Sequence, residues 1–148
     1  FSMIEKVVGN NYTNEPMAFL LEDSEIQEEI EPYIMARIVD FEEFIRQYPF
    51  DIISIHDDLH FIIDDPIMEC NCGDFSLRWD AAGNTILERG GTRGETVRCD
   101  IQTLTAMFYG YKRPTYLKRV ERLQANDTAV RILEDIIPIE QPYFSDYF

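Results

Sequence analysis

The stretch Phe75-Ser-Leu-Arg-Trp-Asp-Ala-Ala-Gly-Asn-Thr-Ile-Leu-Glu88 indicates the fold class of this chain. Its first five residues alternate apolar and polar side chains, which is the pattern of a half-buried β-strand. Residues 80–84 contain the Gly and Asn typical of a turn, and residues 85–88 return as the second strand. We therefore predict a β-hairpin in the middle of the chain.

Further strands and helices are predicted on both sides of this hairpin. The other strands are expected at residues 3–8, 33–39, 59–63, 68–72 and 96–99. Helices are expected at residues 24–31, 40–48, 100–111, 116–123 and 127–137, with Ser24, Asp40, Asp100 and Asp127 as N-caps. A run of strands followed by helices predicts an α+β fold, a mostly antiparallel sheet of about five strands covered by helices.

The charge of the chain is acidic and uneven. The 148 residues include 28 acidic and 13 basic side chains, which gives a net charge of −15. Residues 22–74 hold 16 acidic and 2 basic residues, whereas residues 75–148 hold 10 of each. This balance argues against a nucleic-acid or anionic-membrane surface. We interpret the acidic half as solvated loops and helix faces, and a cation site at Asp57-Asp58 or Asp64-Asp65 is the less favoured alternative.

The sequence shows no stretch that is apolar enough to span a bilayer and no signal-peptide pattern. Its three cysteines are too few for a disulfide scaffold, so we expect a cytoplasmic location. The chain begins at Phe1, and residues 3–8 already have the pattern of a strand. Either a few residues have been trimmed from the start, or the chain is the C-terminal piece of a longer protein, and we favour the second interpretation.

The cysteines and histidines have patterns that favour structural roles. Cys70, Cys72 and Cys99 lack the spacing of a zinc site, and we predict that they are small buried hydrophobic residues. His56 and His60 are four residues apart but lie outside any His-Glu-x-x-His motif. Surface or capping roles are predicted for both, and no metal site is expected.

Two groups of basic residues could contact an anion. The loop 89–94 is rich in Gly but lacks the Gly-Lys-Ser/Thr end of a phosphate loop, so we interpret it as a hairpin connection. The strongest positive patch consists of Lys112, Arg113, Lys118, Arg119 and Arg122. The last three are predicted to share the solvent face of one helix. A solvated face or a salt-bridge surface against another subunit is favoured over phosphate binding.

The C-terminal tail is rich in aromatic residues. Two prolines and four aromatic residues stand among its last eleven positions, and the chain ends at Phe148. Because frayed termini are usually polar, we expect this tail to dock onto a surface. Docking would place the α-carboxylate of Phe148 in a partly enclosed site, where loss of hydration raises its pKa and makes it a stronger proton acceptor.

Several ordered segments together resemble one protein family. They are Pro32-Tyr-Ile-Met-Ala-Arg-Ile-Val-Asp40, Tyr48-Pro-Phe50, Gly73-Asp-Phe-Ser-Leu-Arg-Trp79, Asp100-Ile-Gln-Thr-Leu104, Phe108-Tyr-Gly-Tyr111 and Pro142-Tyr-Phe-Ser-Asp-Tyr-Phe148. Over roughly residues 16–148 the chain resembles the C-terminal region of the enhanced intracellular survival (Eis-like) GNAT acetyltransferases. In that family two GNAT-type domains precede a domain that resembles sterol carrier protein 2.

This resemblance implies a division of the chain and an activity for its parent protein. Residues 23–148 would form the sterol carrier protein 2-like domain, and residues 1–22 would be the edge of a preceding GNAT-like domain. The parent would be an acetyl-CoA-dependent N-acetyltransferase acting on amines, with the terminal carboxylate, here that of Phe148, as general base. The preceding domains would hold acetyl-CoA, so this chain alone is expected to bind no cofactor and to lack activity.

Two functions from different classes therefore stay open. In the first, the chain supports the acetyltransferase and supplies the Phe148 carboxylate; its expected partners are the preceding GNAT domains and other copies in a homo-oligomer. In the second, the chain is a non-catalytic binding domain for lipids or small molecules. The second function requires an apolar pocket of roughly 300 Å³ or more.

Overall fold

This computed structural model describes residues 9, 22, 26–29, 34–51, 57–140 and 142. The chain divides into two compact units, and the helices and strands of the described residues lie in the unit Ala36–Pro142. The strand predicted at residues 3–8 lies outside the described residues. Residues 26–29 form no helix, so the helix predicted over 24–31 is wrong at these positions.

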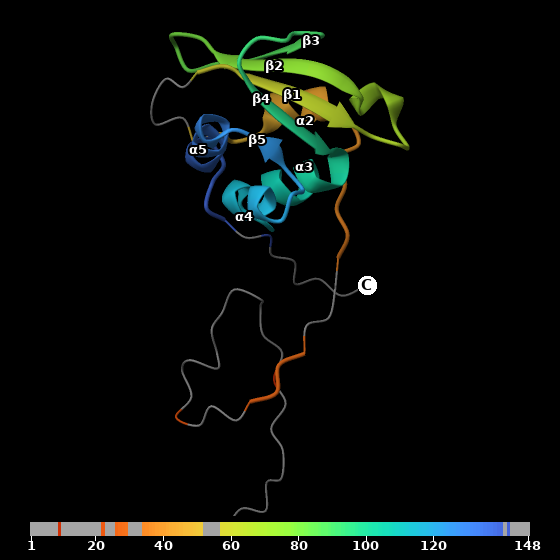
Figure 1. The fold of residues 1–148 in the computed structure, drawn as a ribbon, viewed down its shortest axis with the longest axis vertical. Coiled ribbons are helices and arrows are strands. Elements are labelled where there is room, and N and C mark those ends of the chain that lie inside the picture. The colour runs from red at the N-terminus through yellow and green to blue at the C-terminus, as the bar shows by residue number, and fades with distance from the viewer. Residues whose placement is uncertain are drawn as a thin grey trace, which may run out of the picture. The chain divides into compact units, whose positions relative to one another are not determined.

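A mixed five-stranded sheet in the order β3-β2-β1-β4-β5 forms the centre of this unit (Figure 1). Its strands are β1 (Leu59–Asp64), β2 (Gly73–Trp79), β3 (Thr85–Arg89), β4 (Glu95–Asp100) and β5 (Gln124–Ala125). β1 and β4 pair in parallel, and the other neighbouring strands pair antiparallel. The predicted α+β fold with a mostly antiparallel sheet is confirmed.

The predicted central hairpin is present as β2 and β3. Leu77 pairs with Leu87 in its register. The Asp80 carboxylate accepts hydrogen bonds from the Ala82 and Asn84 N–H groups, both at 2.8 Å, and so organises the turn. Local side-chain and backbone chemistry therefore explains why this stretch could be predicted from its sequence.

Four α-helices and one short 3₁₀ helix accompany the sheet among the described residues. They are α2 (Phe41–Gln47), η1 (Glu69–Asn71), α3 (Ile101–Phe108), α4 (Pro114–Arg119) and α5 (Asp127–Ile136). Asp40 and Asp100 are N-caps as predicted. The N-cap of α5 is Asn126 rather than Asp127, because the Asn126 side chain accepts from the Ala129 N–H while Asp127 pairs with Lys118.

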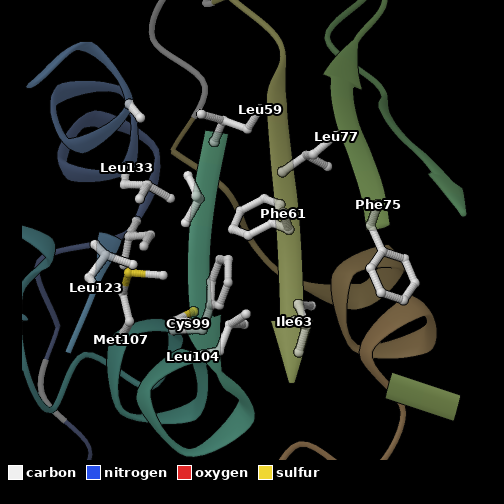
Figure 2. Packing of buried hydrophobic residues seen from close by; sticks show 14 of the residues in the cluster. Leu59, Phe61, Ile63, Phe75, Leu77, Cys99, Leu104, Met107, Leu123 and Leu133 are labelled. Atoms are coloured by element: carbon white, nitrogen blue, oxygen red, sulfur yellow. The ribbon is translucent and has the colours of Figure 1, made fainter. Parts of the chain in front are cut away.

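The helices α3, α4 and α5 lie on one face of the sheet (Figure 1). Buried apolar side chains from these helices and from the strands form one core cluster. Figure 2 shows Phe61 and Ile63 of β1 in this cluster, together with Leu104 and Met107 of α3. These four side chains are buried. Phe41 of α2 adds edge-on ring contacts to Phe61 and Phe75, with centroid distances of 5.7 and 5.0 Å.

The strand predicted at residues 33–39 is wrong, because residues 34–39 form no strand. The backbone of this segment is bound by side chains instead of a neighbouring strand. The Ile38 N–H donates to Thr105 Oγ1 at 3.2 Å, and the Asn71 amide donates to the Ile38 carbonyl at 3.4 Å. Ile38 is buried, whereas Met35 is fully exposed.

The strand predicted at residues 68–72 is also wrong, since this segment contains η1. The alternation of apolar and polar residues there does not correspond to a strand. The Asp65 carboxylate accepts hydrogen bonds from the N–H groups of Ile67 and Met68, at 2.9 and 3.0 Å, and turns the chain before η1. A side chain at the end of β1 therefore determines this conformation.

Candidate functional site

The C-terminal end of α5 is the place from which the predicted catalytic tail departs. Phe148 itself lies outside the described residues, as do residues 143–147. The last described position, Pro142, follows α5 by six residues. The described part of the site is therefore the group of residues that binds the end of α5.

Arg113, the N-cap residue of α4, makes hydrogen bonds to three residues at this end of α5. Its Nε donates to the Glu134 carboxylate at 2.7 Å, and its Nη2 donates to the Glu134 carbonyl at 2.8 Å. Its Nη1 donates to the carbonyls of Ile137 and Pro138, at 2.9 and 3.1 Å. The planar guanidinium thus satisfies carbonyls that a helix end otherwise leaves without a partner.

Glu134 carries the carboxylate of this contact. Burial alone would raise the pKa of Glu134, but hydrogen bonds from the Thr115 backbone and side chain and from the Arg113 guanidinium lower it below its usual value. The ion pair is partly shielded, since 28% of the Arg113 side chain and 27% of the Glu134 side chain are exposed. Glu134 therefore stays ionised and keeps Arg113 in place at neutral pH.

A second segment, just after α2, contacts the same end of α5. The Asp51 N–H donates to the Ile136 carbonyl at 2.9 Å. The Tyr48 hydroxyl donates to the Phe108 carbonyl at 2.8 Å. Burial raises the pKa of Tyr48 to about 12; Arg113 opposes this rise, and the Asp51 and Glu140 carboxylates add to it. Tyr48 is therefore a neutral hydrogen-bond donor beside the start of the tail.

Two surface hollows lie elsewhere in the described part of the chain. One measures about 380 Å³ and is lined by residues 37–40, Glu43, Phe44, Gln47, Tyr48, Pro49 and Tyr109. The Phe44 and Tyr109 rings stack within it at a centroid distance of 5.8 Å. The other measures about 340 Å³ and is lined by residues 62–64, 98–100 and Gln124. Both open to the surface, and the second is mainly polar.

The Gly-rich loop 89–94 is a crossover, so its interpretation as a hairpin connection is wrong. It leads from the edge strand β3 to β4, and β4 pairs with β1 rather than with β3. Arg89 donates to the Cys70 carbonyl at 2.6 Å and pairs with Glu42. Arg93 pairs with Asp58 at 2.6 Å. Because protein groups engage both arginines, this loop offers no free cradle for a phosphate.

His60 is buried, which corrects the prediction of a surface role, and His56 lies outside the described residues. The reason is a partner on the next strand: His60 Nε2 lies 2.7 Å from an Asp74 carboxylate oxygen. Ser76 is the cross-strand neighbour of His60, but its hydroxyl is buried and donates to the Arg93 carbonyl at 2.6 Å. The three side chains therefore offer no accessible nucleophile.

The cysteines are not all buried, contrary to the prediction. Cys99 is buried, Cys72 is partly buried and Cys70 is exposed. Burial, with a smaller contribution from Asp100, raises the pKa of the Cys99 thiol to about 12. Cys70 is exposed because it lies in η1 and not in a strand. Within the described residues, no group of three or more His, Cys, Asp or Glu side chains could hold a metal ion.

The predicted basic set does not converge on one site. The helix predicted over residues 116–123 ends early, because α4 stops at Arg119 and Glu121 adopts a φ of 61°. Arg122 therefore leaves the expected shared face and contacts Asp100 at 3.3 Å. Lys118 pairs with Asp127, while Lys112 and Arg119 lie over tyrosine rings.

A buried charge cluster was missed in the sequence. Asp64 and Asp65 had been grouped as one acidic pair, yet Asp64 is exposed and Asp65 is buried. The Asp65 carboxylate pairs with Arg37 and accepts from the Asn71 amide at 2.9 Å. Burial alone would raise the pKa of Asp65, but hydrogen bonds from Asn71, from two backbone N–H groups and from Arg37 lower it to about 2. This cluster fixes the segment before α2.

Searches for related proteins give a consistent likeness. A family model described as a sterol carrier protein domain matches residues 41–145. A protein of unknown function from Enterococcus faecalis V583, described as a probable N-acyltransferase, is 30% identical with a TM-score of 0.78. That likeness covers 93% of this chain and 34% of the Enterococcus chain. No match was found among curated proteins.

Two further solved structures share the fold. GCN5-related N-acetyltransferases from Anabaena variabilis and Kribbella flavida are 24% and 22% identical, with TM-scores of 0.64 and 0.62. The likeness covers 89% and 93% of this chain, and 33% and 35% of theirs. The chain thus spans about a third of the length of these proteins. No helix among the described residues is long and apolar enough to cross a membrane.

Proposed function

The chain belongs to the sterol carrier protein domain family, and from this premise we propose that it is the C-terminal domain of an acetyl-CoA-dependent N-acetyltransferase acting on amines. The observation that carries the proposal is the likeness to the probable N-acyltransferase of Enterococcus faecalis, because its 30% identity extends over 93% of this chain. The finer assignment to the Eis-like group rests on the resemblance of the ordered segments described above.

In this proposal the catalytic contribution of the chain is the Phe148 carboxylate, which would act as general base. A terminal carboxylate has an ordinary pKa near 3.5, and a dry cleft would raise it toward the range useful for proton transfer. The carboxylate would accept a proton from the amine as the new C–N bond forms. The C–S bond of the thioester would break, and the sulfur of CoA would leave and take up a proton as the free thiol. The end of α5, bound by Arg113 and Asp51, supports the proposal as a fixed starting point for the tail.

Acetyl-CoA is assigned to the preceding domains in this proposal. It would supply the acetyl group, and its phosphates need a cradle of backbone N–H groups or free cations. The Gly-rich loop 89–94 is a poor candidate because Arg89 and Arg93 are engaged by carboxylates. The proposed partners are therefore the GNAT domains of the same chain, with residues 1–22 as the edge of the nearest one.

A homo-oligomer in the cytoplasm completes the proposal. Residues 75–148 are neutral overall but carry ten basic side chains, which could pair with carboxylates of the acidic residues 22–74 of a neighbouring copy. Sedimentation of the full-length protein at low and high salt would test this. Monomers under both conditions would contradict it.

The decisive experiment follows thiol release from acetyl-CoA by the full-length protein with a panel of primary amines: lysine, spermidine and a lysine-rich peptide. Deletion of Phe148, or addition of three glycines after it, should lower kcat about 100-fold, because either change displaces the carboxylate by an ångström or more. The Phe148→Ala variant keeps a carboxylate at the same backbone position and is the matched control. Unchanged kcat in the deletion variant, or no thiol release by the unaltered protein, would overturn the proposal.

A lipid or small-molecule carrier is the second candidate function. The hollow beside Phe44 and Tyr109 favours it, because its volume of about 380 Å³ exceeds the 300 Å³ expected for a ligand pocket. This hollow is open, however, and a carried lipid requires an enclosed apolar space. Titration of the chain with a fluorescent fatty acid would separate the two functions. Saturable binding that Phe44→Ala abolishes would support the carrier function, and an absence of binding would exclude it.

A further inference from the structure

The contacts of Arg113 with the end of α5 indicate a role that its place in the basic set did not suggest. Its three guanidinium nitrogens donate four hydrogen bonds at the end of α5, two to Glu134 and one each to the carbonyls of Ile137 and Pro138. We propose that Arg113 is a positioning residue that fixes the exit direction of the C-terminal tail and so the place of its carboxylate. This inference rests on the proposed function, in which the Phe148 carboxylate is the base.

The end of α5 is bound more completely than a helix end requires. The last four carbonyls of an α-helix have no partner within the helix, and water often satisfies them. Here Arg113 donates a hydrogen bond to the Glu134 carbonyl, and the Asp51 N–H donates one to the Ile136 carbonyl. Arg113 also donates hydrogen bonds to the carbonyls of Ile137 and Pro138, which lie beyond the helix. The direction of the chain through Pro138 is therefore set by groups outside α5.

An arginine is required for this geometry. A guanidinium presents several N–H groups in one plane and can serve separate carbonyls at once. A lysine would keep the positive charge opposite Glu134, but its compact ammonium could not reach the helix carbonyl and the two following carbonyls together. We call the hydrogen bonds of Arg113 to the Ile137 and Pro138 carbonyls the clamp. Replacement of Arg113 by Lys should remove the clamp and keep a positive charge opposite Glu134.

The clamp would act on the proposed base, the Phe148 carboxylate, through the residues of the tail that connect them. Phe148 stands ten positions after Pro138, so a fully extended tail would have a reach of about 35 Å from the residues that Arg113 binds. A tethered group has an effective concentration at its target that depends on where the tether begins and how freely it moves. Loosening the start of the tail should lower the fraction of molecules with an aligned base, and hence kcat. The KM for acetyl-CoA should not change, because other domains are proposed to bind it.

The test is a double-mutant cycle in the full-length protein with acetyl-CoA and the same panel of primary amines. Arg113→Lys should lower kcat about tenfold and leave the KM for acetyl-CoA unchanged. In the protein that lacks Phe148, Arg113→Lys should have no further effect on kcat, because the base is already lost. Arg131→Lys is the matched control, since Arg131 is an exposed residue of α5 without an ion pair among the described residues.

A second measurement detects the clamp without catalysis. In the 148-residue chain, Arg113→Lys should speed amide hydrogen exchange at Ile137, whose N–H donates to the Leu133 carbonyl at 3.1 Å, and leave the exchange of Leu133 unchanged. Unchanged exchange at Ile137, or an equal loss of kcat with and without Phe148, would overturn the inference. Unchanged kcat on deletion of Phe148 would instead overturn the proposed function, so the two failures are distinguishable.

Discussion

Gly94 lies directly against the backbone of Asp58, so that a Cβ built at Gly94 would be 2.3 Å from the Asp58 carbonyl carbon and oxygen. The backbone of Gly94 has a φ of 110°, which residues with a side chain rarely adopt. The next N–H, that of Glu95, donates to the Asp58 carbonyl at 2.8 Å. This contact is where the crossover loop enters β4 and sets the parallel pairing with β1.

Replacement of Gly94 by Ala should therefore lower the free energy of unfolding by about 3 kcal/mol or more. Backbone strain contributes about 1–2 kcal/mol, and the clash with Asp58 adds a similar amount. Gly83→Ala is the matched control, because Gly83 has a φ of 83° but nothing within 4 Å of its Cβ position. Urea unfolding of both variants measures the difference. Equal losses would show that the contact with Asp58 contributes nothing.

Removal of the buried Asn71 amide should lower the free energy of unfolding almost as much as Gly94→Ala. Its side-chain oxygen accepts from the Phe41 N–H at 2.9 Å, and its nitrogen donates to the Asp65 carboxylate at 2.9 Å. Asn71→Ala leaves both buried groups without this partner, so we expect a loss of about 2–4 kcal/mol in the free energy of unfolding. Asn84→Ala, which removes an exposed hydrogen bond to Asp80, should cost less than about 1 kcal/mol. A loss for Asn71→Ala no larger than that of the control would contradict the expectation.

The three thiols should react at very different rates. Exposed Cys70 should react with a disulfide reagent within the mixing time of a conventional assay, whereas Cys99 should react only when the core opens. Burial raises the pKa of Cys99 to about 12, so the thiol stays protonated in the folded chain at pH 9 and its reaction at that pH still requires opening of the core. Mass spectrometry of the labelled chain distinguishes the positions, and Cys70→Ser removes the fast phase. Comparable rates at Cys70 and Cys99 would refute a closed core.

The sequence allowed prediction of those elements that depend on local contacts. The β2–β3 turn follows from Asp80 and its neighbours, and the starts of α2 and α3 follow from Asp40 and Asp100. The strand β4 was also predicted, at residues 96–99, although its pairing was not. In the turn and at the two helix starts, a side chain binds backbone groups within four residues, which a pattern in the sequence can represent.

Two of the wrong predictions, the strand at residues 33–39 and the hairpin connection at residues 89–94, depend on contacts between distant residues. The segment 34–39 is bound by Thr105 and Asn71, and neither partner is near it in the chain. The crossover from β3 to β4 requires β1 as partner, so the loop alone could not distinguish it from a hairpin. Arg113 was included in the basic set, but its contacts with the end of α5 depend on the packing of α4 against α5 and could not be predicted from the sequence.

The last prediction concerns stability in acid, which should depend on Asp65. This carboxylate has a folded pKa of about 2, below the ordinary value of 3.8, so the folded state binds its proton less readily than the unfolded state. Its contribution to the free energy of unfolding is therefore complete above about pH 5 and is lost as the pH falls through 3.8 toward 2. The shift corresponds to about 2 kcal/mol.

Asp65→Asn should lower stability at pH 7 by about 3 kcal/mol, because Arg37 loses its carboxylate partner. Between pH 5 and pH 2 the variant should also lose less stability than the unaltered chain, since the group that binds the proton is gone. Asp64→Asn is the control, because Asp64 is exposed and its side chain has no hydrogen bond or ion pair within the described part of the chain. Urea unfolding at pH 7, 5, 3 and 2 measures all three proteins. If Asp65→Asn and the unaltered chain lost stability in parallel as the pH fell, Asp65 would not be the group responsible.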